Sequence, residues 1–150
     1  MMETLFKFTD VELSKYVKDD PVRPHLCSEF RTTYNCEAFG LIEEDVVKAI
    51  ICVAHTRSVP KTEKELTTNA KVGNEHVITP YTVWSYSRGA GRRLVNSIID
   101  MVKEEHADKE VKPRIVTLSP KTDMAERFHI NNGAVYLSSN KETNNFEYLI

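Results

Sequence analysis

Two glycines and three arginines stand together where the sequence changes from a strand pattern to a helix pattern. The aromatic and β-branched run 81–86 precedes them, and an amphipathic run follows. The five residues are Arg88, Gly89, Gly91, Arg92 and Arg93. The first amides of a helix have no intrahelical acceptor and lie at the positive end of the helix dipole, and glycines let an anion come close to them. These residue types at this spacing predict a phosphate-binding loop.

A simpler interpretation is a glycine turn whose arginines are solvated. The stretch lacks the GK[ST] ending of a P-loop, and SRGAG does not complete the GxGxxG pattern of dinucleotide-binding proteins. The loop alone does not decide between the two interpretations, so the elements around it must.

The cysteines and histidines show no spacing typical of a metal site. The three cysteines form no CxxC pair, and the five histidines form neither HExxH nor HxH. We therefore expect no structural metal. Three thiols that cannot all pair within the chain are typical of a reducing compartment, which predicts a cytoplasmic protein.

Length and composition are typical of one globular domain over residues 1–150. The chain is 41% hydrophobic and 28% charged, with a formal net charge of −2 at pH 7. This charge gives no reason to expect a nucleic-acid partner. No apolar run is long enough to cross a membrane, and the N-terminus lacks a signal-peptide pattern, so no membrane association is expected.

The glycine loop lies inside a predicted strand–helix–strand unit. From Gly91 onward, six apolar residues share one face of a helix: Leu94, Val95, Ile98, Ile99, Met101 and Val102. After a charged link, strand 114–119 is expected to be buried and parallel to strand 81–86, with the helix as the crossover. The first strand is expected over 77–86, and because Pro80 has no amide hydrogen, its regular pairing is expected from Tyr81 onward.

The remaining elements complete an α+β fold. A helix is expected over 9–20, capped by Thr9 or Asp10, and segment 22–35 has partial helical spacing that Pro24 interrupts. The other predictions are antiparallel strands over 36–45 and 46–56 joined by a tight acidic turn, a surface connection over 57–76 with at most one helical turn, a helix over 119–133 ended by Gly133, and a hairpin of 134–139 with 144–150.

The order and spacing of these motifs resemble the GNAT superfamily of acyl-CoA-dependent N-acetyltransferases over residues 36–150. In that family a strand runs into a [Q/R]xxGx[G/A] loop that opens a helix, and here the register gives Tyr86-Ser87-Arg88-Gly89-Ala90-Gly91. A later family pattern, NxxAxxLYxxxGF, is similar to TDMAERFHINNGA, in which the matching residues are Thr122, Ala125, Phe128, His129 and Gly133. Tyr86 departs from the leading Gln or Arg, and a loop two residues shorter would make Arg88 the leading arginine.

The resemblance implies a mixed, mostly antiparallel sheet with a central splayed parallel strand pair flanked by helices. Acetyl-CoA, as co-substrate, would lie between the diverging strands with its pyrophosphate on the loop amides. The binding residues that this implies are Val83, Trp84, Ser85, Tyr86, Ser87, Arg88, Gly89, Ala90, Gly91, Arg92 and Thr122.

The resemblance also implies a proton donor for the departing thiolate. His129 stands where the family often has a tyrosine, and a histidine with the ordinary pKa of about 6.5 could donate at neutral pH. The alternative is a histidine that only packs. No acidic residue lies between Val77 and Tyr86 to act as a general base. The nearest candidates by sequence are Glu75, His76 and His55, and a water chain is the alternative.

The sequence therefore predicts an enzyme that moves an acetyl group from acetyl-CoA to a primary amine of an unidentified acceptor, by direct attack in a ternary complex. The departures from the family pattern leave a second hypothesis, a catalytically inactive GNAT-fold binding or structural module. A third, an unrelated nucleotide-binding α/β protein, has no specific motif. The expected partners are acetyl-CoA and an amine-bearing acceptor, and the exposed edge of the final hairpin is compatible with a homodimer.

Overall fold

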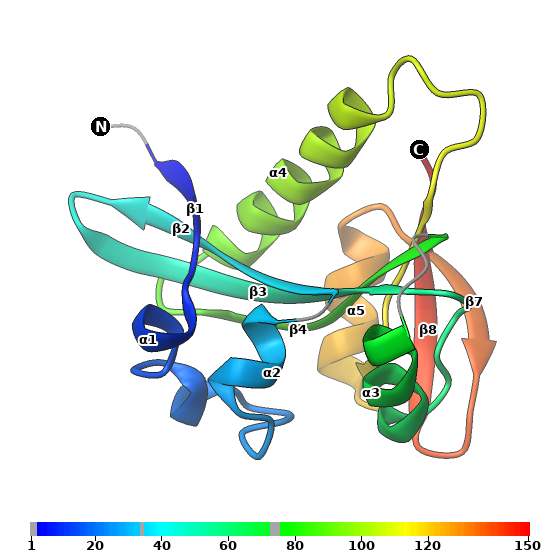
Figure 1. Ribbon diagram of the computed structural model, residues 1–150, viewed down its shortest axis with the longest axis horizontal. Helices are drawn as coiled ribbons and strands as arrows, with labels where there is room; N and C mark the ends of the chain where they lie inside the picture. The colour runs from blue at the N-terminus through cyan, green and yellow to red at the C-terminus, as the bar shows by residue number, and fades with distance from the viewer. Residues whose placement is uncertain (1–2, 34, 73–75) are drawn as a thin grey trace.

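A computed structural model describes residues 3–33, 35–72 and 76–150 (Figure 1). Within these ranges an eight-stranded mixed sheet runs in the order β1-β2-β3-β4-β5-β8-β6, with β7 on the other side of β8. The elements are β1 (Thr4–Lys7), α1 (Asp10–Leu13), the 3₁₀ helix η1 (Val17–Asp19), α2 (Ser28–Thr32), β2 (Cys36–Glu43), β3 (Val46–Thr56), α3 (Glu63–Val72), β4 (Val77–Ser85), α4 (Ala90–Glu105), β5 (Arg114–Val116), β6 (Ser119–Pro120), α5 (Asp123–Asn131), β7 (Val135–Ser139) and β8 (Thr143–Tyr148).

Strands β2 and β3 form the antiparallel hairpin that the sequence predicts. Glu44 and Asp45 make its tight turn with φ of 52° and 65°, the left-handed backbone that two-residue hairpin turns require. Strand β1 pairs with β2 at the edge of the sheet. The sequence predicted no element there, because four residues are too few for a strand pattern to stand out.

Strands β4 and β5 are parallel neighbours for two residue pairs and then diverge. Val77 pairs with Arg114 and Ile78 with Ile115. Beyond these pairs, β5 and β6 follow β8 as one interrupted strand. The predicted splay is thus confirmed, and we call the opening between the second half of β4 and β6 the wedge.

A bulge interrupts β4 at the start of the wedge. Cys52 of β3 pairs with Thr82 and Val53 pairs with Pro80, which leaves Tyr81 with no pairing partner on β3. The expectation that pairing begins at Tyr81 is wrong, since β4 pairs with β3 from Val77 onward. Pro80 is tolerated because it lies next to a bulge, where the ladder is already irregular.

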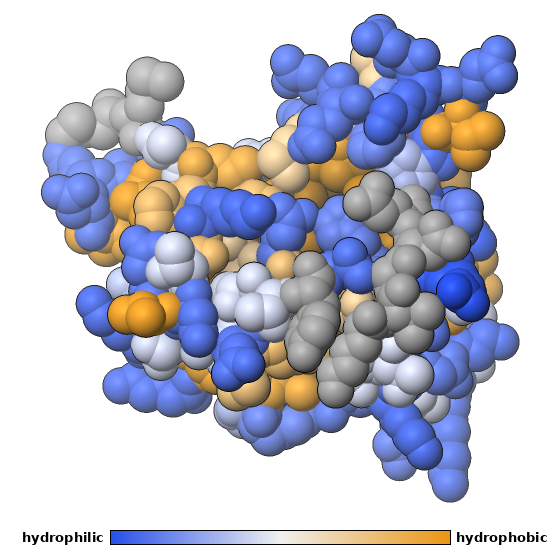
Figure 2. Space-filling model, in the orientation of Figure 1, coloured by the Kyte–Doolittle hydropathy of each residue, from blue (hydrophilic) through white to orange (hydrophobic). Residues whose placement is uncertain are grey.

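Helix α4 is the crossover between the parallel strands, as predicted, and it covers one face of the sheet. It begins at Ala90, with Gly89 as the N-cap at φ 78°. Its buried residues join the larger apolar cluster, which contains Leu94, Val95, Ile98, Val102, Ile51, Val53, Ile78, Ile115 and Phe146, among others. We call this side of the sheet the α4 face. Hydrophilic side chains gather over the far end of α4 and the charged link that follows it (Figure 2).

Helices α1, α2 and α3 lie on the other side of the sheet (Figure 1), which we call the α1–α3 face. The single helix expected over 9–20 is wrong in extent, although Thr9 does cap α1 in a capping box with Glu12. The chain turns away after η1 because the carboxylate of Asp20 is buried, where its Oδ1 accepts the amides of Val22 (2.8 Å) and Arg23 (2.9 Å).

The connection over 57–76 contains more helix than predicted. Helix α3 spans ten residues and buries Leu66 and Ala70 completely. Two buried residues do not make a sustained periodic pattern, so the sequence showed only a polar segment. In the described part of segment 22–35 the α-helix is α2.

The C-terminal elements agree with the sequence. Thr122 caps α5, Gly133 follows it with φ 100°, and β7 and β8 form the final hairpin. Strand β7 pairs with β8 alone among the described residues and so leaves an edge, while the homodimer stays a prediction. No helix in the described ranges is long and apolar enough to cross a membrane.

Candidate active site

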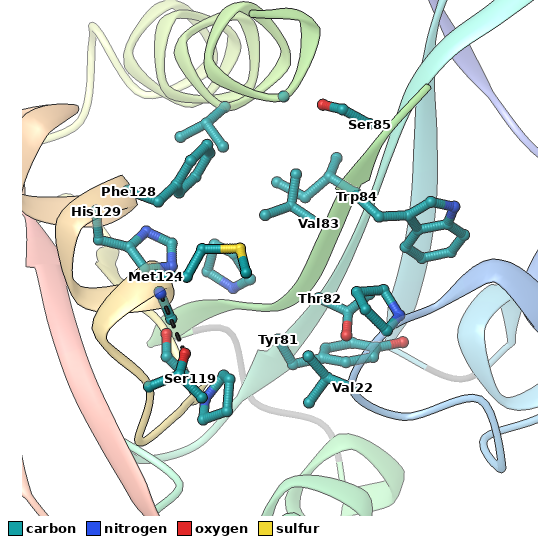
Figure 3. Close-up of a pocket in the computed structure, with 18 of the residues that line it drawn as sticks. Val22, Tyr81, Thr82, Val83, Trp84, Ser85, Ser119, Met124, Phe128 and His129 are labelled. Atoms are coloured by element: carbon teal, nitrogen blue, oxygen red, sulfur yellow. Dashed lines mark hydrogen bonds between the residues drawn. The ribbon is translucent and has the colours of Figure 1, made fainter. Parts of the chain in front are cut away.

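The wedge opens into a pocket of about 850 Å³ (Figure 3). One wall is β4 from Pro80 to Ser85, and the opposite wall is β6 and the first two turns of α5. The first turn of α4 and the segment after η1 lie at its ends. The predicted binding residues that line it are Val83, Trp84, Ser85, Tyr86, Gly91 and Thr122, and His129 lines it too.

The first turn of α4 has free amide donors. In the loop, the Ala90 amide donates to the Ser87 carbonyl (3.1 Å), and the Arg93 amide donates to the Gly89 carbonyl (3.2 Å). The other loop and first-turn amides find no acceptor among the described residues: Arg88, Gly89, Gly91 and Arg92. Free amides at the positive end of a sixteen-residue helix fit an anionic group.

Gly91 allows a close approach at this point. A Cβ atom on Gly91 would lie 2.7 Å from the Ser85 hydroxyl oxygen and 3.6 Å from the Phe128 ring. A side chain at position 91 would therefore force the Ser85 hydroxyl to move. Ala90 is buried beneath the loop, while Ser87, Arg88, Gly89 and Arg92 lie outside the lining of the pocket.

The three arginines of the loop differ in their partners. Arg93 is held by two hydrogen bonds to the Glu3 carboxylate, from Nε (2.7 Å) and from a terminal nitrogen (2.8 Å). Arg88 and Arg92 are exposed and form no ion pair within the described part of the chain. Only Arg88 and Arg92 therefore have charge available for a ligand at the loop.

Tyr86 points away from the glycine loop. Its hydroxyl donates to Oδ2 of Asp19 (2.6 Å) and accepts from the indole nitrogen of Trp84 (2.9 Å). Burial, together with the hydrogen bond to Asp19, raises the pKa of Tyr86 to about 12. Tyr86, at the leading position of the loop, is thus hydrogen-bonded to η1 through Asp19.

His129 is buried beside the pocket and paired with a tyrosine of β8. Its Nδ1 lies 2.7 Å from the Tyr148 hydroxyl, and its ring stacks on Phe146 with the centroids 5.3 Å apart. Burial lowers the pKa of His129 to about 4. At pH 7 about one molecule in a thousand would therefore carry an imidazolium here, contrary to the ordinary pKa assumed from the sequence.

Thr122 has a structural task at the start of α5. Its hydroxyl oxygen accepts the amide of Ala125 (3.2 Å) as the helix cap. The hydroxyl hydrogen remains free to donate toward the pocket. Thr122 can thus serve as a cap and a ligand contact together.

The candidate bases named from the sequence do not line the pocket. His55 is engaged with Glu37 at 2.7 Å, and Glu75 lies outside the described residues. His76 is exposed at the start of β4, away from the wedge. The carboxylate that does line the pocket is Asp19.

A buried arginine joins the two walls of the wedge where they separate. The guanidinium of Arg23 donates to the carbonyl of Tyr81 on β4 and to the carbonyl of Leu118 (3.3 Å) between β5 and β6. Its Nε also contacts Glu63 of α3 at 3.1 Å. Behind it, Arg31 pairs with Asp20 at 2.7 Å and donates to the Arg23 carbonyl at 2.6 Å.

Sequence analysis missed the contributions of residues distant from the motifs. Asp19, Arg23 and Tyr148 come from segments whose contacts with the wedge have no periodic or spacing signal. Among the described residues, no group of three or more His, Cys, Asp or Glu side chains could hold a metal ion.

No protein-family model matches the chain, and no curated protein matches it. Its fold is nevertheless shared with many solved structures. A putative GNAT-family acetyltransferase from Desulfovibrio desulfuricans has a TM-score of 0.65 at 11% identity and covers 97% of both chains. The ribosomal-protein-S18-alanine N-acetyltransferase from Escherichia coli has a TM-score of 0.61 at 12% identity over 97% of this chain and 90% of that one. AtaTR, solved with AcCoA bound, has a TM-score of 0.61 at 14% identity over 97% and 92%.

Two other structures of similar fold differ from the acetyltransferases in length or in the molecule bound. This chain matches only 31% of the longer malonyl-CoA decarboxylase from Cupriavidus metallidurans, with a TM-score of 0.53 at 15% identity over 79% of this chain. KacTA, solved as a complex with DNA, has a TM-score of 0.58 at 14% identity over 98% and 92%. The absence of a nucleic-acid partner therefore stays a prediction. At these identities the likeness concerns the fold, and the chain has the open, mostly antiparallel, splayed fold of the GNAT N-acetyltransferases.

Proposed function

We propose that the chain is an acetyl-CoA-dependent N-acetyltransferase that transfers acetyl to a primary amine by direct attack in a ternary complex. The observation that carries the proposal is a pocket that opens between two diverging parallel strands and ends at the free amides of α4. The AcCoA complex of the similar AtaTR supports the choice of co-substrate.

The pocket and the loop give the two ends of acetyl-CoA different environments. The pyrophosphate would take the amides of Gly89 and Gly91, with Arg88 and Arg92 adding charge from the exposed side. The pantetheine arm would follow β4 from Ser85 inward, because the edge of β4 that faces the wedge has no neighbouring strand there. The thioester then lies near the bulge at Tyr81.

His129 would act in its neutral form. With the Tyr148 hydroxyl donating to Nδ1, Nε2 carries the hydrogen and donates a hydrogen bond to the sulfur as the carbon–sulfur bond breaks. A neutral imidazole stabilises a developing thiolate without transferring its own proton. Tyr148 is in this view a positioning residue that fixes the tautomer of His129.

One observation favours the alternative, an inactive binding module. The histidine at the position of the family's proton donor is buried, and burial lowers its pKa to about 4. A module of this kind would bind acetyl-CoA and leave it intact. Both the enzyme and the inactive module would therefore bind acetyl-CoA, but only the enzyme would transfer its acetyl group.

The test combines calorimetry with labelled acetyl transfer. We expect acetyl-CoA to bind with a dissociation constant below about 1 mM and radiolabel to pass to amines in a broad acceptor panel. Radiolabel is preferable to a thiol-reactive dye because Cys27 is exposed. In His129→Phe, turnover should fall about tenfold or more with acetyl-CoA affinity unchanged, as for a group that acts on the transition state.

Absence of binding at millimolar acetyl-CoA would overturn the proposal. Binding without transfer to any amine would select the inactive module. Unchanged turnover in His129→Phe would remove the imidazole from the chemistry while leaving the proposed reaction in place.

A further inference from the structure

The outer end of the pocket has apolar walls that reach the surface. Pro21 and Val22 follow η1 on one side, and Pro120 and Met124 stand on the opposite side. Val22 is 37% exposed and Met124 is 76% exposed. Figure 3 shows Met124 and Val22 lying across the pocket from each other. Exposed apolar side chains on both sides of an opening suit a ligand with an apolar body.

One fixed carboxylate stands at this end. Asp19 is the only acidic residue among the described residues that line the pocket, and no lysine or arginine lines it. Its Oδ2 accepts the Tyr86 hydroxyl at 2.6 Å, and Tyr86 is itself held by Trp84. Oδ1 has no hydrogen-bond donor within the described residues. An oriented carboxylate with one free oxygen is an acceptor for an ammonium group.

The two ends of the pocket therefore have opposite charge. The α4 end has free amides with Arg88 and Arg92 nearby, and the η1 end has Asp19. An anionic coenzyme and a cationic acceptor would each be drawn to a different end. A carboxylate on the acceptor next to its amine would be repelled by Asp19.

We infer that the acceptor is a hydrophobic primary amine without a carboxylate beside the amine, and that it enters the wedge past Asp19. The inference rests on the proposed function and adds the class of its second substrate. A primary amine with a pKa near that of lysine, about 10, arrives as an ammonium ion, which Asp19 attracts. Pro21, Val22, Pro120 and Met124 cover its apolar body.

The reaction balances without another reactant. The ammonium first releases one proton to solvent. The nitrogen lone pair forms the new carbon–nitrogen bond, and the carbon–sulfur bond breaks with its electron pair on sulfur. A second proton leaves the nitrogen and is taken up by the thiolate, so that the products are an amide, coenzyme A thiol and one released proton.

Matched acceptors test the class. Phenethylamine, L-phenylalaninamide and L-phenylalanine share the ring and the amine, and only phenylalanine has a carboxylate, while ethanolamine lacks the apolar body. We expect kcat/KM for phenethylamine to exceed the values for phenylalanine and for ethanolamine by about tenfold or more, with the value for phenylalaninamide above that for phenylalanine.

Variants assign the preference to Asp19. Asp19→Asn should lower kcat/KM for phenethylamine about fivefold or more and narrow its advantage over phenylalanine, with acetyl-CoA affinity within about twofold of wild type. Asp45→Asn is the matched control, because Asp45 lies in the β2–β3 turn with φ 65°, which asparagine tolerates, and it does not line the pocket. Asp45→Asn should change neither kcat/KM for phenethylamine nor the advantage of phenethylamine over phenylalanine.

Calorimetric titration of phenethylamine into the protein saturated with coenzyme A gives a second readout that needs no turnover. Binding that is weakened in Asp19→Asn supports the inference. Equal use of phenylalanine and phenethylamine, or no binding and no transfer for phenethylamine by a protein that binds acetyl-CoA, overturns the inference alone. Failure to bind acetyl-CoA would overturn the proposed function instead.

Discussion

The two faces of the sheet are held together by different physics. On the α4 face the buried side chains are almost all apolar, and the histidine buried beside them is neutral. On the α1–α3 face, apolar packing surrounds three enclosed charged residues: Asp20, Arg23 and Arg31 are 3%, 3% and 0% exposed. We call these three residues the buried triad.

The two faces therefore contribute differently to the site. The α4 face supplies groups that would contact the ligand, and the α1–α3 face supplies groups that hold the walls of the pocket. Helix α4 brings its free amides to the loop through apolar packing, with the Arg93–Glu3 pair on its exposed side. The buried triad instead reaches both walls of the wedge through backbone carbonyls, at Tyr81 and Leu118. The shape of the pocket thus depends on buried ions that no ligand need touch.

The largest expected effect comes from breaking the buried triad. Arg31→Met should destabilise the fold by about 3–5 kcal/mol, because it leaves the Asp20 carboxylate buried without its partner. Urea unfolding measured at pH 7 gives the change in the free energy of unfolding.

A double variant separates charge from packing. Asp20→Asn with Arg31→Met should recover part of the loss, since the unpaired charge is gone. On the α4 face, Leu94→Ala should cost about 2–5 kcal/mol through the cavity it leaves, with no such recovery when Asp20→Asn is added. A loss below about 1 kcal/mol in Arg31→Met would mean that the triad is not what distinguishes the two faces.

The sequence was most informative about the α4 face. Helix α4 was predicted because Leu94, Val95, Ile98 and Val102 recur at helical spacing and all four are buried. The acidic hairpin turn and the glycine after α5 were predicted because local backbone chemistry determines them. These features depend on neighbours within a few residues in the chain.

The α1–α3 face could not be predicted in the same way. The spacing in segment 22–35 gives no sign that Arg31 is buried, and its pairing with Asp20 and its bond to the Arg23 carbonyl explain its burial. Helix α3 was missed because its face has few apolar residues and Glu63 contacts Arg23 instead. Long-range polar contacts decide these elements, and they leave no period in the sequence.

The residues of the candidate site also fall into two groups, those found from the sequence and those found only from the fold. The glycine loop came from a local motif, and Thr122, His129, Val83, Trp84 and Ser85 came from the resemblance to the GNAT superfamily. Whether these residues bind and act as proposed stays a prediction. Asp19 and Tyr148 were found only when the fold brought η1 and β8 to the pocket.

A pH effect of intermediate size should come from the α4 face. The pKa of His129 is about 4 in the folded state and near 6.5 when unfolded, so between these values the unfolded state alone binds the proton. Stability should therefore fall as the pH is lowered, by about 2 kcal/mol between pH 7 and pH 5 from this residue. Urea unfolding at the two pH values measures it.

His129→Gln provides the reference for that effect, because glutamine can still bond to Tyr148 and does not titrate. The variant should be less sensitive to this pH change than wild type by about 2 kcal/mol. Glu37, whose pKa is lowered to about 2 by its hydrogen bond to His55, loses its contribution mainly below pH 4.5, outside this window. An identical pH dependence in wild type and variant would show that His129 titrates normally and is accessible to water.

The smallest expected effect concerns binding and compares two glycines with the same backbone requirement. Gly89 and Gly133 have φ of 78° and 100°, so glutamate strains either position. Gly89 caps the N-terminus of α4 at the loop, where a glutamate carboxylate would oppose an anionic ligand. A Cβ on Gly133, by contrast, meets nothing within 4 Å, and Gly133 does not line the wedge pocket. Calorimetry should show acetyl-CoA affinity weakened about tenfold or more in Gly89→Glu and nearly unchanged in Gly133→Glu, although both lose stability. Equal weakening of acetyl-CoA binding in the two variants would mean that general destabilisation causes it, and the loop would no longer be the coenzyme site. Weaker binding in Gly89→Glu alone would support a pyrophosphate site at the N-terminus of α4, where the amides are free.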